Sequence, residues 1–349
     1  MDITKTIHRY LTTAPASHFV GQTVTVLGAW EGSENLLWRV ECRGQAAVVK
    51  LYLDAGQARG RRQFDAHERY APFGLAPRPL WFDRYPEGLS RQLLVYEWTP
   101  GDSLSMGEPA QAAALALTVA RVHQADPSTV RRFCPNPFNL DYFWRILRGG
   151  MGSAQQWLTH GADNPLGAWV AELTTRAERL VHAALPLWGA AQPTPVHGDL
   201  RPENVLYRFG DAILLDWELF GLGDPALDVA RLLQQSRPDL EEAGQVEWLA
   251  HYLGRVEQPG LGERIAVYDH LLPLQAASFL LNGLRHYMQH MQRPAGDGAL
   301  AEVMPFLQIA TSAALVQAAT ALQMDVAVAE VEGAVAETFG ALSPAQTSP

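Results

Sequence analysis

Asp199, Asn204 and Asp216 carry oxygen atoms that could serve one reaction, because these residues lie close together in the sequence. Phosphoryl transfer from a nucleoside triphosphate needs a carboxylate near the acceptor hydroxyl and oxygen ligands that hold Mg²⁺ against the phosphates. The three residues supply that set. The sequence therefore predicts a phosphoryl-transfer centre between His197 and Asp216.

Two short β-rich runs, residues 205–207 and 212–215, lie between these side chains and predict a β-hairpin. Asp199 falls on the loop that enters the hairpin, and Asp216 follows its second strand. Antiparallel pairing brings the two ends of a hairpin together, so we expect Asp199, Asn204 and Asp216 to lie at one end of it.

The order of these residues carries a family resemblance. His-Gly-Asp at residues 197–199, followed by Asn204 and Asp216, resembles the signature of the aminoglycoside phosphotransferase and choline kinase superfamily. The resemblance implies that Asp199 is the catalytic base and that Asn204 and Asp216 hold Mg²⁺, with ATP as the phosphoryl donor. It also implies that His197 orients the loop.

The segment that follows the centre, residues 221–230, resembles the next segment of the same superfamily. Asp224 precedes Pro225, a pattern typical of a helix N-cap with proline at the first helical position. Asp228 matches the aspartate that braces the catalytic loop in the superfamily. We therefore expect Asp224 and Asp228 to be structural supports.

Residues 48–52 resemble the third strand of a kinase small lobe, whose lysine pairs with the phosphates of ATP. The resemblance places Lys50 in that role, although an isolated strand lysine is usually a solvated edge residue. Gly32 and Ser33 fall between the first two predicted strands, where the superfamily has a phosphate-covering turn. Without that context the same residues would form an ordinary hairpin turn.

Residues 93–101 resemble the linker between the two kinase lobes. The resemblance implies that backbone groups of roughly Glu97 to Thr99 bond the adenine, while a preference for ATP over GTP stays open. Trp98 could stack on the base or serve as a buried linker aromatic, and the sequence favours neither interpretation.

The partner of Lys50 departs from the family pattern. The helix of the small lobe normally presents a glutamate to the lysine, but Gln63 falls near that position in this chain. Asp65 and Glu68 are the nearby acidic residues. If neither of these acids reaches Lys50, we expect the positioning of ATP to differ in detail or the enzyme to be slow.

The predicted elements indicate an α+β, bilobal, protein-kinase-like fold. A small antiparallel sheet with one helix forms an N-terminal nucleotide-binding lobe, residues 1–98. A mainly helical catalytic and substrate-binding lobe, residues 99–342, and a flexible tail, residues 343–349, follow. The strands are expected at residues 23–27, 35–41, 46–52, 80–83 and 93–98, and the clearest helices at 55–71, 109–124 and 166–184.

The composition limits the partners and the location of the chain. A formal net charge of −10 argues against a general affinity for nucleic acid. Cys42 and Cys134 are too far apart to indicate a disulfide framework or a zinc ribbon.

No export signal is readable, and the apolar run 305–324 contains polar residues that favour a packed helix over a membrane span. We expect a cytoplasmic monomer or homodimer, with residues 301–342 completing the second lobe or forming a dimer interface.

The pattern as a whole predicts an ATP-dependent kinase that phosphorylates a hydroxyl of a small molecule. The superfamily's acceptors include aminoglycosides, macrolides, choline, ethanolamine, thiamine, homoserine and sugars. Asp-Trp-Glu at 216–218 resembles choline and thiamine kinases more than many antibiotic enzymes. Two alternatives stay open: a pseudokinase-like nucleotide- or ligand-binding protein, and a metal hydrolase that uses His197, Asp199 and Asp216.

Overall fold

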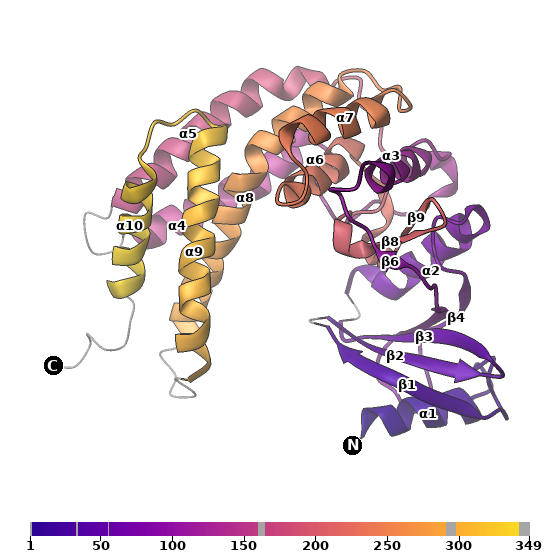
Figure 1. Ribbon diagram of the computed structural model, residues 1–349. Helices are drawn as coiled ribbons and strands as arrows, with labels where there is room; N and C mark the ends of the chain where they lie inside the picture. Colours follow the sequence, from indigo (N-terminus) through magenta and orange to yellow (C-terminus); the bar gives the residue numbers. More distant parts are fainter. Residues whose placement is uncertain (1, 33, 55, 160–164, 291–297, 342–349) are drawn as a thin grey trace. The chain divides into compact units, whose positions relative to one another are not determined.

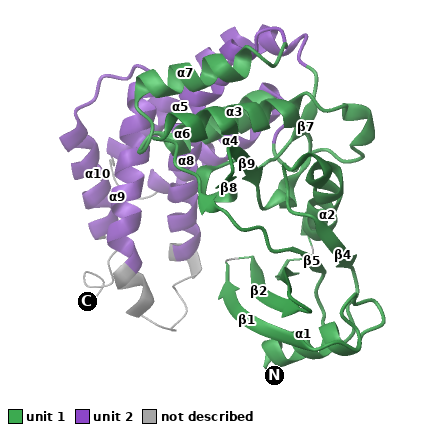
Figure 2. Ribbon diagram, turned by 45° about the vertical axis from the view of Figure 1, so that its right-hand side comes forward, with its two compact units in different colours: residues 1–136, 192–257 green, residues 137–191, 258–349 purple. Residues whose placement is uncertain are grey.

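The computed structural model describes every residue except 1, 33, 55, 160–164, 291–297 and 342–349. The chain forms two compact units, which Figure 2 colours separately. Unit 1 contains residues 1–136 and 192–257, and unit 2 contains residues 137–191 and 258–349. The predicted lobe boundary at 98/99 falls inside unit 1 and stays a prediction, and the predicted tail, 343–349, lies outside the described residues.

A five-stranded antiparallel sheet in unit 1 confirms the predicted sheet (Figure 1). Its spatial order is β1-β2-β3-β5-β4, so the fifth strand of the chain pairs between the third and the fourth. The α+β class predicted from the sequence is therefore the observed one. The strands are β1 (Val24–Glu31), β2 (Asn35–Cys42), β3 (Gln45–Tyr52), β4 (Pro79–Asp83) and β5 (Leu93–Glu97).

The alternation of side chains along β3 separates two environments. Val49 and Leu51 face a buried apolar cluster that includes Trp38 and residues of the helix α1 (Ile3–Thr13). Because successive strand side chains point to opposite faces, Lys50 faces the other side of the sheet. One face of the strand thus packs with α1, and the other presents Lys50, between Val48 and Tyr52, to the rest of unit 1.

Helix α1 has a sequence signal that the sequence analysis did not use. Asp2 caps it, and its Oδ1 accepts hydrogen bonds from the N–H groups of Thr4 and Lys5. Ile7 and Leu11 are fully buried, at the i, i+4 spacing that makes one helical face apolar. The cap and this spacing together explain why a helix forms before the first strand.

Helix α2 (Arg59–Tyr70) begins four residues later than predicted. The chain before it adopts left-handed backbone conformations, with φ of 56° at Gln57 and 55° at Ala58, which an α-helix cannot contain. The remaining elements of unit 1 are β6 (Asp102–Ser103), α3 (Pro109–His123), β7 (Thr194–Val196), β8 (Val205–Arg208), β9 (Asp211–Leu214), β10 (Gly221–Gly223), α6 (Pro225–Ser236) and α7 (Glu242–Leu253).

The regular secondary structure of unit 2 is helical in its described residues. Residues 301–342, left unassigned by the sequence, lie mostly in α9 and α10, which pack on each other, while α9 also packs on α8 and α10 on α5. One stretch among the described residues, Val303–Ala321, has the length and hydropathy of a membrane-spanning helix, and a third of it is buried. The helices are α4 (Leu140–Leu158), α5 (Pro165–Ala184), α8 (Leu261–His290), α9 (Gly298–Ala321) and α10 (Val328–Ala341).

Candidate active site

The hairpin β8–β9 brings the predicted centre together within unit 1. Val205 pairs with Leu214, and the N–H of Leu215 donates to the carbonyl of Asn204 at 2.8 Å. Asp216 follows directly, with a left-handed φ of 59°, a conformation that aspartate tolerates better than most residues. The predicted hairpin is therefore present, and it places Asn204 beside the end of β9.

Asn204 also fixes the position of Asp199. Its Nδ2 donates to both the backbone carbonyl and Oδ2 of Asp199, each at 3.0 Å. Because Nδ2 makes both bonds, Oδ1 of Asn204 is the atom left to coordinate a cation. Arg201, which the sequence analysis missed, forms an ion pair with Oδ2 of Asp199 at 3.1 Å. Only its position two residues after the aspartate hints at this contact.

His197 is buried, and its ring contacts both the loop that carries Asp199 and the end of β9. Its Nε2 lies 2.7 Å from the carbonyl of Leu215, and its Nδ1 accepts the N–H of Asp199 at 3.3 Å. Burial lowers the pKa of the imidazole, so the ring is neutral near pH 7, with Nε2 as the donor. This pair of contacts ties the Asp199 backbone to the end of β9.

Asp228 accepts hydrogen bonds from the backbone of the same loop. Its carboxylate receives the N–H of His197 at 2.8 Å and that of Gly198 at 3.0 Å, and His123 Nε2 lies 3.4 Å away. Burial alone would raise the pKa of Asp228, but the hydrogen bonds from His123 and from the backbone N–H of His197 hold it below its usual value. A buried, ionised carboxylate therefore supports the loop.

Asp224 has a different local task. Its side chain accepts the N–H of Ala226 at 3.0 Å at the N-terminus of α6, where Pro225 occupies the first turn. This contact satisfies a backbone donor that has no partner within the helix. Asp224 therefore fixes the start of the helix that carries Asp228.

Gly198 is required by the geometry of the loop. Its φ is +87°, and a Cβ atom there would lie 2.7 Å from Cβ of Leu219 and 2.8 Å from its carbonyl oxygen. Both the backbone conformation and the space exclude a side chain. The middle residue of His-Gly-Asp thus lets the loop approach the segment after Asp216.

Lys50 reaches the same centre from β3. It is 2% exposed, its Nζ forms an ion pair with Asp216, and it lies 3.3 Å from Oε2 of Glu218. Nζ also donates to Oε1 of Gln63 at 3.1 Å. Of the three candidates from the helix, Gln63 is the one in contact with Lys50, and the second carboxylate comes from Glu218 instead.

Asp65, one of the other two candidates, is engaged elsewhere. It pairs with Arg61 and with Arg132, each at 2.7 Å. Glu68 is exposed on the same helix. The sequence signal for Glu218 was its place two residues after Asp216, which a search confined to the helix could not use.

The two carboxylates around Lys50 do not contribute equally to balancing its charge. Burial opposes the charged form of Lys50, but the carboxylates of Asp216 and Glu218 outweigh it and raise its pKa. Burial also opposes ionisation of Asp216, yet the Lys50 ammonium holds the pKa of that carboxyl below its usual value. Burial and the nearby Asp216 raise the pKa of Glu218. Asp216 is therefore the principal counter-charge.

Gln63 belongs to a buried polar network. Its Oε1 accepts the hydroxyl of Tyr52 at 2.6 Å as well as the ammonium of Lys50. Its Nε2 lies 3.4 Å from Nε2 of His67, whose pKa burial lowers to about 3, so that this imidazole is neutral. An amide at position 63 thus serves two donors on one side and a neutral histidine on the other.

The predicted nucleotide-side residues lie at the sheet and the linker. The N–H of Gly32 closes the turn by donating to the carbonyl of Asn35 at 2.9 Å, and Ser33 lies outside the described residues. The side chain of Glu97 pairs with Arg78 and accepts the amide of Gln45 at 2.7 Å. The turn and the linker are therefore both held by neighbouring residues.

Trp98 has an aromatic neighbour that the sequence analysis missed. Trp30 stacks near it with ring centroids 6.3 Å apart and planes 17° apart, and the Arg39 guanidinium lies 4.2 Å from the Trp98 ring. The backbone N–H groups of Glu97 and Trp98 already donate to the carbonyls of Arg78, just before β4, and of Ala46 in β3. An adenine here would meet the neighbouring backbone groups and an exposed indole, that of Trp30.

The donor set fits magnesium better than a transition metal. Among the described residues there is no group of three or more His, Cys, Asp and Glu side chains that could hold a metal ion. Mg²⁺ needs no such cage, because it is usually bound by one or two carboxylates together with substrate phosphates and water. Asp216 and the Oδ1 of Asn204 would supply the protein ligands.

Comparisons with known proteins agree with this fold. The chain superposes on a choline/ethanolamine kinase family protein from Mesorhizobium loti over 95% of its length and 99% of that chain, with a TM-score of 0.60 and 18% identity. It superposes on an aminoglycoside phosphotransferase from Alicyclobacillus acidocaldarius over 89% and 93%, with a TM-score of 0.58 and 16% identity. At these identities the likeness establishes the kinase-like fold alone.

Two comparisons concern the sequence itself. A stretch of 49 residues is 39% identical to protein LicA of Haemophilus influenzae, covering 14% of this chain and 18% of the length of LicA. The profile of the phosphotransferase enzyme family matches residues 25–267. That match spans well over half of the chain and includes Lys50 and the whole 197–216 segment, in agreement with the predicted resemblance. The chain therefore belongs to the phosphotransferase enzyme family.

Proposed function

We propose that this chain is an ATP-dependent small-molecule kinase that transfers the γ-phosphate of ATP to a hydroxyl group. We place it in the cytoplasm, as a monomer or homodimer. The observation that carries the proposal is that the side chains of Lys50, Asp199, Asn204 and Asp216 lie in one centre. Asn204 holds Asp199 by two hydrogen bonds, and Lys50 reaches Asp216 from the sheet. Phosphoryl transfer needs such a base and such ligands at one place.

In the proposed reaction, Asp199 accepts the proton of the acceptor hydroxyl as that oxygen bonds to the γ-phosphorus of ATP. The bond from that phosphorus to the β,γ-bridging oxygen breaks, and ADP leaves. The carboxylate is already oriented by Asn204 and paired with Arg201, which would have to release Oδ2 for the acceptor or leave Oδ1 to receive the proton. Mg²⁺, held by Asn204 and Asp216, would neutralise the charge of the phosphate oxygens. Lys50 would exchange part of its contact with the carboxylates for contact with the phosphates.

ATP as donor is supported by a relative. An aminoglycoside phosphotransferase, APH(4)-Ia, with a TM-score of 0.57 and 16% identity to this chain, has been solved in a ternary complex with AMP-PNP and hygromycin B. In this chain the Trp30–Trp98 pair lies at the linker, where the adenine of such a nucleotide would rest. We propose that the adenine binds at that place, next to the backbone that follows Trp98.

The acceptor is proposed to be a small metabolite or antibiotic that bears a hydroxyl. The structural relatives include a choline/ethanolamine kinase family protein and aminoglycoside phosphotransferases. Choline, ethanolamine and aminoglycosides are all cationic alcohols, and a chain with a net charge of −10 attracts cations over long range. Cationic alcohols are therefore the first acceptors to test.

A binding protein without turnover is the second candidate, and one observation favours it. Lys50 is neutralised by Asp216 and Glu218, while Asp199 is paired with Arg201, so the polar groups of the centre satisfy one another. A kinase would have to break two of these pairs to bind substrates. Measured turnover separates the two functions.

The test is ADP release by the purified protein with Mg·ATP across choline, ethanolamine, thiamine, homoserine, sugars, macrolides and aminoglycosides. Asp199→Ala is the inactive variant, and Asp211→Ala, an exposed aspartate of the same hairpin, is the matched control. Acceptor-dependent release by the wild type and the control, but not by Asp199→Ala, is expected. ATP binding without release for any acceptor would support the binding protein, and absence of ATP binding would refute the kinase.

A further inference from the structure

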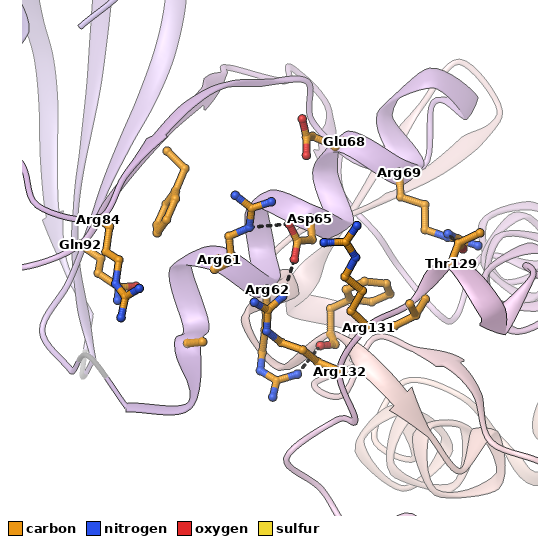
Figure 3. Close-up of a pocket in the computed structure, with 14 residues that line it drawn as sticks. Arg61, Arg62, Asp65, Glu68, Arg69, Arg84, Gln92, Thr129, Arg131 and Arg132 are labelled. Atoms are coloured by element: carbon orange, nitrogen blue, oxygen red, sulfur yellow. Dashed lines mark hydrogen bonds and ion pairs between the residues drawn. The ribbon is translucent and has the colours of Figure 1, made fainter. Parts of the chain in front are cut away.

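A cavity of about 1010 Å³ lies beside α2 and is lined by residues of that helix and also by Phe82 of the sheet strand β4 (Figure 3). Its walls come from α2, from residues at β4 and just before β5, from the segment 129–132 and from Phe220, all within unit 1. Lys50, Asp199, Asn204 and Asp216 are not among its lining residues. The cavity is therefore a different place from the proposed phosphoryl-transfer centre.

The lining is strongly basic in a chain that is acidic overall. The net charge of the chain is −10, yet six arginines line this one cavity against two carboxylates, Asp65 and Glu68. Figure 3 shows these side chains gathered around the open space. We call them the arginine pocket: Arg61, Arg62, Arg69, Arg84, Arg131 and Arg132.

The helical periodicity of α2 explains why the arginines of this helix line the pocket. The buried face of α2 carries Gln63 and His67, whereas Arg61 and Asp65 lie on its other face at i, i+4 spacing. Arg132 approaches from the segment 129–132 and shares the same Asp65 carboxylate. Two guanidinium groups therefore divide the charge of one carboxylate.

Among the described residues, the hydrogen-bond partners of the Arg62 guanidinium are neutral backbone carbonyls. It donates to the carbonyls of Gln57 at 2.7 Å, Phe133 at 2.8 Å and Phe220 at 2.9 Å. Burial lowers its pKa, and the nearby Arg132 charge acts in the same direction. The carbonyl contacts fix the guanidinium in place. The nearby Asp65 carboxylate, which already pairs with Arg61 and Arg132, compensates only part of the positive charge at this place.

Arg84 and Arg131 are exposed and form no ion pair with a carboxylate in the part of the chain that the structure describes. Arg84 lies 5.3 Å from the ring of Tyr85, and its charge is otherwise open to solvent. These two side chains enter the pocket from opposite walls, next to β4 and from the segment 129–132 (Figure 3). They are the groups best able to close on a ligand.

We propose that the arginine pocket binds a small polyanion that carries two or more phosphate groups. Guanidinium forks match phosphate oxygens with paired hydrogen bonds, and the cavity has the size of a small-molecule site. This ligand is additional to the ATP and the acceptor of the proposed function. Since α2 also carries Arg59 and Gln63, which contact Glu218 and Lys50, the ligand would bind to the helix that faces the centre.

The test is isothermal titration of the full chain with inorganic triphosphate in EDTA, so that the Mg²⁺-dependent centre does not contribute. Wild type is compared with the double variant Arg84→Gln/Arg131→Gln, which removes only exposed, unpaired charges. The matched control is Arg121→Gln/Arg179→Gln, two exposed arginines outside the pocket. We expect one triphosphate per chain, affinity at least about tenfold weaker in the pocket variant, and no change in the control.

Equal affinity in the pocket variant and the wild type would overturn the proposal. So would citrate binding as tightly as triphosphate, or a polyglutamate peptide binding where triphosphate does not, since each result removes the preference for phosphate. If thermal unfolding shows that the double variant does not fold, Arg131→Gln alone replaces it, with about threefold weaker binding expected. The titration requires no turnover, so its outcome is independent of the proposed kinase activity.

Discussion

The loop at residues 197–204 and the cluster around Lys50 both bury charge, but different partners hold them. The loop is fixed by backbone N–H groups that donate to Asp228 and by a neutral His197, so its geometry depends on one carboxylate. Lys50 instead has two carboxylates and an amide around one ammonium, drawn from α2 and from the segment after β9.

This difference predicts that the loop is rigid, whereas the contacts of Lys50 can change. A carboxylate that accepts two backbone N–H groups holds a loop in one conformation, because losing the carboxylate would leave buried donors unsatisfied. A lysine with two alternative carboxylates can shift between them, or toward an arriving phosphate, without losing all its partners. We therefore expect the loop to position the base and the Lys50 cluster to respond to the nucleotide.

The largest effect is expected at Asp199. Asp199→Ala should lower the rate of phosphoryl transfer by about 10²–10⁴-fold or more, because the acceptor proton then has no base, while ATP binding should persist. Steady-state ADP release and equilibrium nucleotide binding measure the two quantities. Substantial turnover by the variant would contradict the assigned mechanism and with it the role of the loop.

Asp216→Ala should affect both regions, since Asp216 is the principal partner of Lys50 and a proposed Mg²⁺ ligand. We expect Mg·ATP binding to weaken by about 100-fold, in addition to the loss of activity, because Mg²⁺ loses one of its two proposed protein ligands. Titration of Mg·ATP measures the affinity, and Asp211→Ala is the control. Unchanged affinity would show that Asp216 contacts neither metal nor nucleotide.

An exchange between Gln63 and Glu218 tests whether Lys50 needs its second carboxylate at a fixed place. Glu218→Gln should weaken Mg·ATP binding by about tenfold, since Lys50 and Arg59 both lose a charged partner. Adding Gln63→Glu restores one carboxylate beside Lys50 and should recover most of the affinity. A double variant that binds no better than Glu218→Gln would show that position 218 itself matters.

The smallest effect is a pH dependence of stability through Asp228. Its pKa in the folded chain lies below the unfolded value of about 3.9, so its contribution is present above that pH and is lost as the pH falls through the folded pKa. Asp228→Asn should lower the free energy of unfolding by about 2 kcal/mol at pH 7. Urea unfolding at pH 7 and pH 3 should show the gap between variant and wild type shrinking. A constant gap would mean that the carboxylate charge is not what holds the loop.

The sequence was informative wherever partners lie near one another along the chain. Asn204 and Asp199 are five residues apart, the hairpin joins Asn204 to Leu215, and Asp224 caps the helix that begins one residue later. Turn propensity, pairing geometry and capping operate over such distances, so these contacts follow from local patterns. Helix α1 shows the same rule, since its cap and apolar spacing were readable although the sequence analysis left them unused.

By itself, then, the sequence predicted the five-stranded sheet and the hairpin, both of which the structure contains, and the residues of the 197–216 centre, whose roles stay a prediction. Only the tertiary structure decided that Glu218 and Gln63 surround Lys50, that Arg201 pairs with Asp199, and that six arginines share one cavity. Lys50 and Glu218 are far apart in the chain, and nothing in their local sequence says which side chains will face each other. That choice depends on how the sheet, α2 and the segment after β9 pack, because packing fixes side-chain direction and burial together.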